Sequence, residues 1–114
     1  MQMLIMVLNN VSHLEHILNE FESSGIHGAT IIDSTGMAKV ISHAKPNELP
    51  IFGSLRMLMN EQRPFNKTIF TVIKDSQVQT AITAIKNVVG DLSKPDVGIV
   101  FTVPVSFWEG INVD

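Results

Sequence analysis

The chain has 114 residues, which suffices for one domain with its own hydrophobic core and leaves no room for a second domain. It contains no cysteine, which excludes thiolate catalysis, zinc–thiolate sites and a disulfide framework, and which fits a reducing compartment such as the cytoplasm. The formal net charge is −3 and there is no cluster of lysine and arginine, so nucleic acid is not an expected partner.

The first predicted strand is the apolar run Met3–Leu8. It is far too short to span a membrane and has no basic flank or cleavage site, so we expect a soluble cytoplasmic protein. The run does not alternate, whereas a strand with one solvated face shows polar residues on that face. Only 17% of all residues are charged, against about 25% in ordinary soluble domains. We therefore expect other copies of the chain to cover the second face of the sheet; a monomer with some exposed apolar side chains is the alternative.

One pattern occurs twice in the chain, about sixty-four residues apart. Each copy has an apolar run, a Ser-x-x-Glu/Gln cap and an amphipathic helix, predicted over Ser12–Ser24 and over Ser76–Val89. Gly25 and Gly90 follow the two helices as expected stop signals. At this offset the apolar positions of the two helices coincide, which places both helices against one core.

Three further strands complete the pattern, at Ala29–Asp33, Lys67–Lys74 and Ile99–Val103. The order strand, helix, strand therefore occurs twice. This order predicts an α+β ferredoxin-like sandwich (βαββαβ), with a four-stranded antiparallel sheet and two helices on one face. The fold alone does not define an activity, because such folds carry many unrelated ones.

The second and third strands are joined by an unusually long connection, Ser42–Asn66, where two to five residues would suffice. Apolar residues recur there at helical spacing between two prolines, which predicts a short helix over Pro50–Gln62. That helix either caps the sandwich or a subunit boundary, or forms an adaptable docking surface for a partner protein. The residues of the expected docking surface are Phe52, Leu55, Arg56 and Met59.

Two segments, Gly25–Gly36 and Val100–Val105, resemble the PII nitrogen-regulatory signalling family. In that family a Gly-Ile-x-Gly turn precedes the second strand, and a Phe-x-x-Pro-Val strand closes the fold. The resemblance implies a homotrimer with effector clefts between subunits. It also implies that Ser42–Asn66 is the family's T-loop, which inserts into target proteins.

The resemblance places a small effector at the base of this connection and at the turn before the last strand. The residues concerned are Gly36, Met37, Ala38, Lys39 and Gly98. Family members bind ATP or ADP with two glycines at the T-loop base. Here Gly36 matches the first, Ala38 replaces the second, and Lys39 retains a positive charge. Val40 stands where the family has a glutamine linked to magnesium and 2-oxoglutarate.

The remaining nucleotide-binding motifs of the family are weaker still in this chain. The family's Gly-Asp-Gly-Lys loop corresponds to Pro95–Gly98, which keeps one glycine and lacks the lysine. Gly110 and Asn112 stand at the positions of its two C-terminal arginines. Polyphosphate needs donated amides and cations, so tight ATP binding is not expected. The chain has no tyrosine, so the tyrosine-directed modification of the T-loop cannot occur.

Histidines offer the main alternative chemistry. His13 and His16 are three residues apart on the first helix, a spacing that can place both rings on one metal. A metal-handling trimer like the divalent-cation-tolerance family is therefore an alternative to the PII interpretation, and a solvated helix face is the simpler one. His27 and His43 are single loop histidines with no carboxylate partner visible in the sequence, and an enzyme is not expected.

Overall fold

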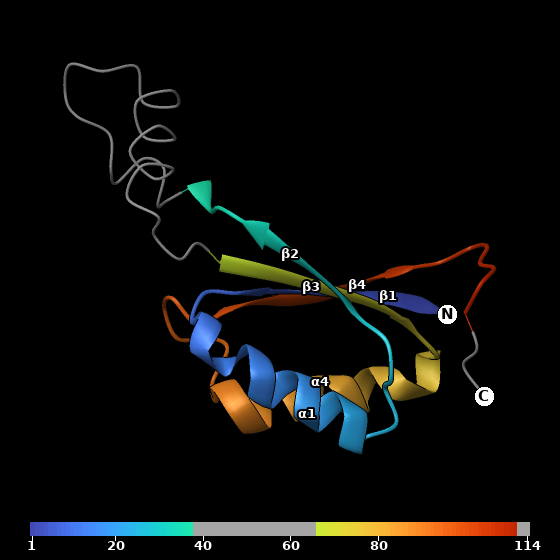
Figure 1. Cartoon of the computed structure of the whole chain (residues 1–114), viewed down its shortest axis with the longest axis horizontal. Helices are drawn as coiled ribbons and strands as arrows, with labels where there is room; N and C mark the ends of the chain where they lie inside the picture. The colour runs from blue at the N-terminus through green and yellow to red at the C-terminus, as the bar shows by residue number, and fades with distance from the viewer. Residues whose placement is uncertain (38–65, 112–114) are drawn as a thin grey trace, which may run out of the picture.

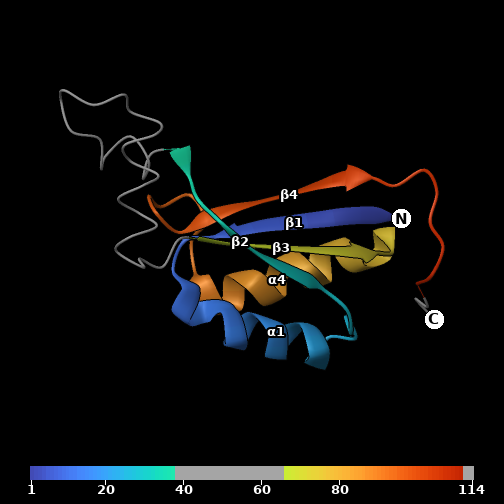
Figure 2. The same cartoon turned by 45° about the horizontal axis from the view of Figure 1, so that its top comes forward.

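The structure is a computed structural model that describes residues 1–37 and 66–111. Its four strands form one open antiparallel sheet in the order β2-β3-β1-β4, with both helices on the same face (Figures 1 and 2). The predicted ferredoxin-like βαββαβ architecture is confirmed. The elements are β1 (Gln2–Leu8), the 3₁₀ turn η1 (Val11–His13), α1 (Leu14–Ser23), β2 (Thr30–Ser34), β3 (Asn66–Ile73), the 3₁₀ turn η2 (Asp75–Gln77), α4 (Val78–Val89) and β4 (Gly98–Pro104).

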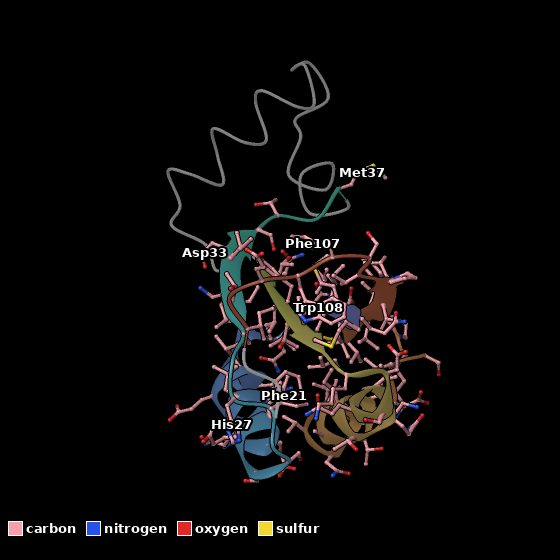
Figure 3. All side chains as sticks on the ribbon, turned by 90° about the vertical axis from the view of Figure 1, so that its right-hand side faces the viewer. Phe21, His27, Asp33, Met37, Phe107 and Trp108 are labelled. Atoms are coloured by element: carbon pink, nitrogen blue, oxygen red, sulfur yellow. The ribbon has the colours of Figure 1, made fainter. Side chains whose placement is uncertain are left out.

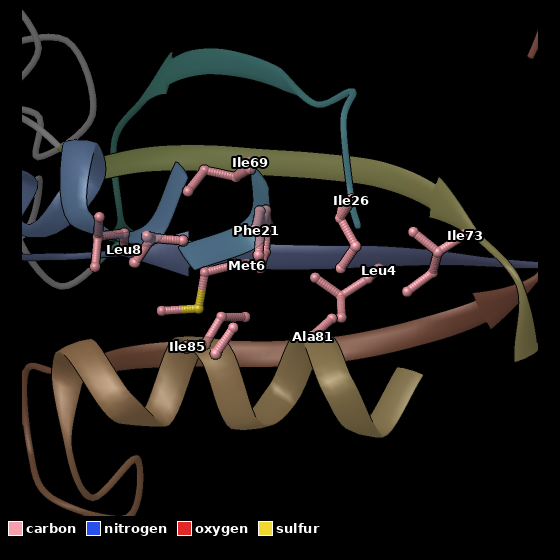
Figure 4. Close-up of a cluster of buried hydrophobic side chains, with 11 residues drawn as sticks. Leu4, Met6, Leu8, Phe21, Ile26, Ile69, Ile73, Ala81 and Ile85 are labelled. Atoms are coloured by element: carbon pink, nitrogen blue, oxygen red, sulfur yellow. The ribbon is translucent and has the colours of Figure 1, made fainter. Parts of the chain in front are cut away.

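The hydrophobic core lies between the sheet and the two helices (Figure 4). Every second residue of β1 points into it, and Leu4, Met6 and Leu8 are fully buried. They meet Phe21 of α1 and Ile85 of α4, which come from equivalent places in the two repeats. Each such side chain contributes about 1.5 to 3 kcal/mol when it is buried completely. The repeat seen in the sequence is thus a repeat of core positions.

The two helices begin differently from the sequence prediction. Asn10 caps the first turn, because its Oδ1 accepts a hydrogen bond from the backbone N–H of Ser12 (3.1 Å). In the second repeat the side chain of Gln77 accepts from the N–H of Lys74 (2.9 Å), and Ser76 caps nothing. Each chain segment first makes a 3₁₀ turn, so each α-helix starts two residues after the predicted serine. The predicted Ser-x-x-Glu/Gln caps are therefore wrong, although both helices are present.

The other face of the sheet is apolar, and no helix of the described residues covers it. The register alternates along β1, so the residues beside the buried ones point to this second face. We call it the open face; its apolar members are Met3, Ile5, Val7, Ile32, Phe70, Val72, Ile99, Phe101 and Val103. It is accessible on both edge strands, where Ile99 and Phe101 of β4 are 56% and 44% exposed and Ile32 of β2 is 48% exposed. The non-alternating first strand is thereby explained, since both of its faces carry apolar side chains.

The two ends of the long connection leave the sheet side by side. Ser34, the last residue of β2, pairs with Asn66, the first of β3. The Ser34 hydroxyl lies 2.6 Å from Asn66 Oδ1 and 2.7 Å from Thr68 Oγ1, so it joins both strands. The helix predicted over Pro50–Gln62 lies outside the described residues. Within the described part of the chain, no helix is long and apolar enough to cross a membrane.

Candidate functional site

The sequence-predicted effector residues lie at the end of the sheet from which the connection leaves. Gly36 and Met37 lie just beyond the end of β2 at Ser34, and Met37 is 77% exposed. Gly98 begins β4 at the opposite edge of the sheet. One register row crosses all four strands at this end, through Asp33, Lys67, Leu8 and Gly98. Three strand spacings of about 4.8 Å separate the two edges by about 14 Å, so one chain does not bring these residues into one pocket. Ala38 and Lys39 lie outside the described residues.

Gly98 has a structural reason to be glycine. Its φ is +148°, and a Cβ added there would lie 2.3 Å from the carbonyl oxygen of Val7. A side chain would therefore force β4 away from β1. The close approach of β4 to β1 therefore explains why Pro95–Gly98 keeps the glycine that it shares with the family's Gly-Asp-Gly-Lys loop. No bound ligand is needed to account for this glycine. Asp96 in the same turn adopts a left-handed conformation (φ +64°), which aspartate tolerates better than most residues.

A pocket of about 900 Å³ lies at the other end of the sheet. Four parts of the described chain line it: residues 25–30, which lead into β2, residues 70–74 at the end of β3, Gln77 of η2, and Gly110 with Ile111. Figure 3 views the molecule from this side and shows the C-terminal segment passing from β4 toward β2. The sequence analysis missed this pocket. The Gly25–Gly28 turn was visible in the sequence, but nothing there indicated that the C-terminal segment lies beside it.

The turn into β2 is held firmly against β3. Thr71 is 4% exposed, and its hydroxyl donates a hydrogen bond to the carbonyl of Gly28. Ile26 is 4% exposed and packs into the core. These contacts fix the backbone that forms one wall of the pocket, so the pocket belongs to the folded domain.

His27, which also lines the pocket, has a carboxylate partner that the sequence analysis did not find. Its Nδ1 lies 3.0 Å from Glu22 Oε2. Glu22 is near the end of α1, and the chain turns back at Gly25, which brings the two side chains together. The partner was not visible in the sequence, because only the turn at Gly25 brings Glu22 beside His27. Because both side chains are 68% exposed, the pair orients the ring more than it stabilises the fold.

Two aspartates near the ends of the elements have lowered pKa values. The N-terminal ammonium group of Met1 lies 3.1 Å from Asp75 Oδ1 and lowers the pKa of that carboxyl by hydrogen bonding and by its charge. In the loop before β4, the hydroxyl and the backbone N–H of Ser93 both donate to Asp91 and lower its pKa. Neither aspartate lines the pocket. Both stabilise turns, and Asp75 ties the start of β1 to η2.

The metal alternative gains no further ligand from the structure. Across residues 1–37 and 66–111, no three His, Asp or Glu side chains are grouped closely enough to hold a metal ion. His13 Nδ1 is buried without a hydrogen-bond partner, and His16 is exposed on α1. The two histidines thus remain a pair without a third ligand among the described residues.

The fold and the resemblance noted in the sequence are supported by a comparison with protein families. The family model described as nitrogen regulatory protein P-II matches residues 1–113. The chain belongs to this family. Membership makes it a P-II-like regulatory protein, and the open sheet with two helices agrees with the P-II fold. No curated protein matches the chain.

Proposed function

We propose that this P-II protein is a cytoplasmic homotrimeric regulator. It senses a small effector in clefts between its subunits and docks on a partner protein through the long connection between β2 and β3. The observation that supports this most directly is the open face, which is apolar on all four strands. The family description supports nitrogen regulation as the process.

The open face favours self-association for an energetic reason. Ile99, Phe101 and Val103 are 56%, 44% and 37% exposed, and they lie in one line along the edge strand β4. Burying such surface releases about 25 cal/mol per Å². Identical chains present the same face to one another, so each copy covers the others. The family resemblance supports three copies in the assembly.

The geometry of the candidate effector residues also favours an assembly. Gly36 and Met37 lie at one edge of the sheet and Gly98 lies at the other. A neighbouring copy would supply the opposite wall of a cleft at each edge. We propose that Ala38 and Lys39 complete this cleft. Binding or release of the effector there would be passed on to the connection, because Ala38 and Lys39 shortly precede Ser42 in the chain.

The connection is the proposed contact with a partner protein. Its Phe52, Leu55 and Met59 supply flexible apolar surface, and Arg56 supplies a polar rim. The effector would be less charged than ATP. The turn Pro95–Gly98 has no lysine, and Gly110 stands where the family has an arginine.

Two measurements test this function. Light scattering should give a mass of about three subunits of 12.6 kDa each. A clean monomer at micromolar concentration would refute the assembly and the clefts that depend on it. Titration calorimetry with ATP should show no tight binding, and a micromolar dissociation constant would contradict the proposal that the effector is less charged than ATP.

A further inference from the structure

We propose that the pocket beside the β2 turn binds a small molecule with an apolar body and a single carboxylate, which pairs with Lys74. This inference goes beyond the proposed function, because the pocket lies at the end of the sheet opposite the proposed effector residues. Nothing in the sequence pattern had assigned a ligand to this end of the sheet.

Part of the pocket wall is accessible apolar surface. It comes from Phe70 and Val72 of β3 and from Ile111 of the C-terminal segment, whereas Ile26 and Ile73 are buried in the core and leave almost no surface to a ligand. Ile111 is 41% exposed, so it retains apolar surface that a ligand can cover. A volume of about 900 Å³ is typical of pockets that hold small organic molecules. The body of the ligand is therefore expected to be apolar.

The described lining of the pocket carries one positively charged side chain. Among the described residues that line the pocket, Lys74 is the sole lysine or arginine, and none is an aspartate or a glutamate. The neighbouring Asp75 carboxylate is paired with the N-terminal ammonium group at 3.1 Å. Within the described residues, no carboxylate lies within 4 Å of the Lys74 ammonium group. One ammonium group matches one carboxylate and is insufficient for a polyphosphate.

Some of the other polar groups of the pocket are already engaged. The Thr71 hydroxyl donates to Gly28, and the Gln77 side chain accepts from the N–H of Lys74. His27 is held through Nδ1 by Glu22, which leaves its Nε2 edge for a polar atom of the ligand. The exposed Thr30 hydroxyl and the Gln77 NH2 group are further polar contacts at the pocket, and Lys74 is the charged group among its described lining residues.

The pocket is connected to the open face. Phe70 and Val72 line the pocket and also belong to that face. A second copy packed against the open face would therefore border the pocket. A ligand that rests on Phe70 would contact the same strand that the neighbour covers, which couples its binding to the packing of the subunits.

A matched pair of probes tests the inference. The acid is 3-phenylpropionate, and 3-phenylpropanamide has nearly the same shape without the charge. We expect the acid to bind and to shift the amide NMR signals of residues 25–30 and 70–74. The neutral amide should bind at least about tenfold more weakly, because a charge-assisted bond is lost. Lys74→Gln should weaken the acid by a similar factor. Lys94→Gln removes the same charge from an exposed loop and should change nothing.

Three results would overturn the inference. The first is no binding of the acid at 10 mM, roughly ten times the weakest dissociation constant of interest. The others are equal binding of acid and amide, and unchanged binding of the acid to a Lys74→Gln variant with native circular dichroism. Light scattering on the same samples shows whether the pocket proposal or the proposed assembly has failed. A trimer that ignores the acid refutes this inference alone. A monomer that binds the acid through Lys74 refutes the assembly and leaves the chemistry of the pocket in place.

Discussion

The assembly through the open face predicts a large effect of Phe101→Asp. Phe101 lies in the middle of β4 opposite Ile5 and is 44% exposed. With about 200 Å² for a phenylalanine side chain, about 90 Å² is left for a neighbour to bury, which contributes about 2 kcal/mol per subunit. A buried unpaired carboxylate costs a further several kcal/mol. Together about 5 kcal/mol per subunit weakens association by more than about a thousandfold.

The assay is size-exclusion chromatography with light scattering at micromolar concentration. The variant should be a monomer with native circular dichroism, since Phe101 lies outside the core between the sheet and the helices. Thr80→Asp introduces the same charge at an exposed position on α4 and should keep the mass of the wild type. Ile99→Asp on the same strand repeats the test if the first variant does not fold. A folded Phe101→Asp variant with the full mass of the assembly would refute the reasoning.

Three further predictions concern the described domain. Gly98→Ala should lower the free energy of unfolding in urea by about 2 kcal/mol or more, because the new Cβ meets backbone at a strained φ. Gly28→Ala, with open space and an ordinary φ, is its control and should change that free energy by less than about 0.5 kcal/mol. Thr71→Val should cost about 1 to 2 kcal/mol, because the Gly28 carbonyl loses its hydrogen bond; an unchanged urea midpoint would contradict this role. The lowered pKa of Asp91 stabilises the fold above its unfolded value of about 3.8, and this contribution is lost as the pH falls through the lower folded value. The stability advantage of the wild type over Asp91→Asn should therefore shrink as the pH falls below about 3.8, and a constant difference would contradict the assignment.

Much of the fold could be predicted from local sequence patterns. The apolar stripes of both helices and the continuous apolar run of the first strand correspond to the observed core and to the two apolar faces of β1. These patterns are reliable because the side chains of a helix or strand point in directions set by the period of the backbone. The first turns of the helices were predicted less well. Ser12, the predicted cap, donates both its backbone N–H and its hydroxyl to Asn10 Oδ1, and the sequence does not show which of the two polar side chains is the cap.

The sequence by itself determined the order of elements, the core face of each helix and the apolar character of both faces of the first strand. Only the tertiary structure decided which side chains share a site. Strand register places Gly98 across the full width of the sheet from Gly36. The pocket forms from residues 25–30, 70–74 and 110–111, which are far apart in the chain. The reason is physical: periodicity fixes the direction of a side chain within its own element, whereas a site depends on how separate elements pack against one another.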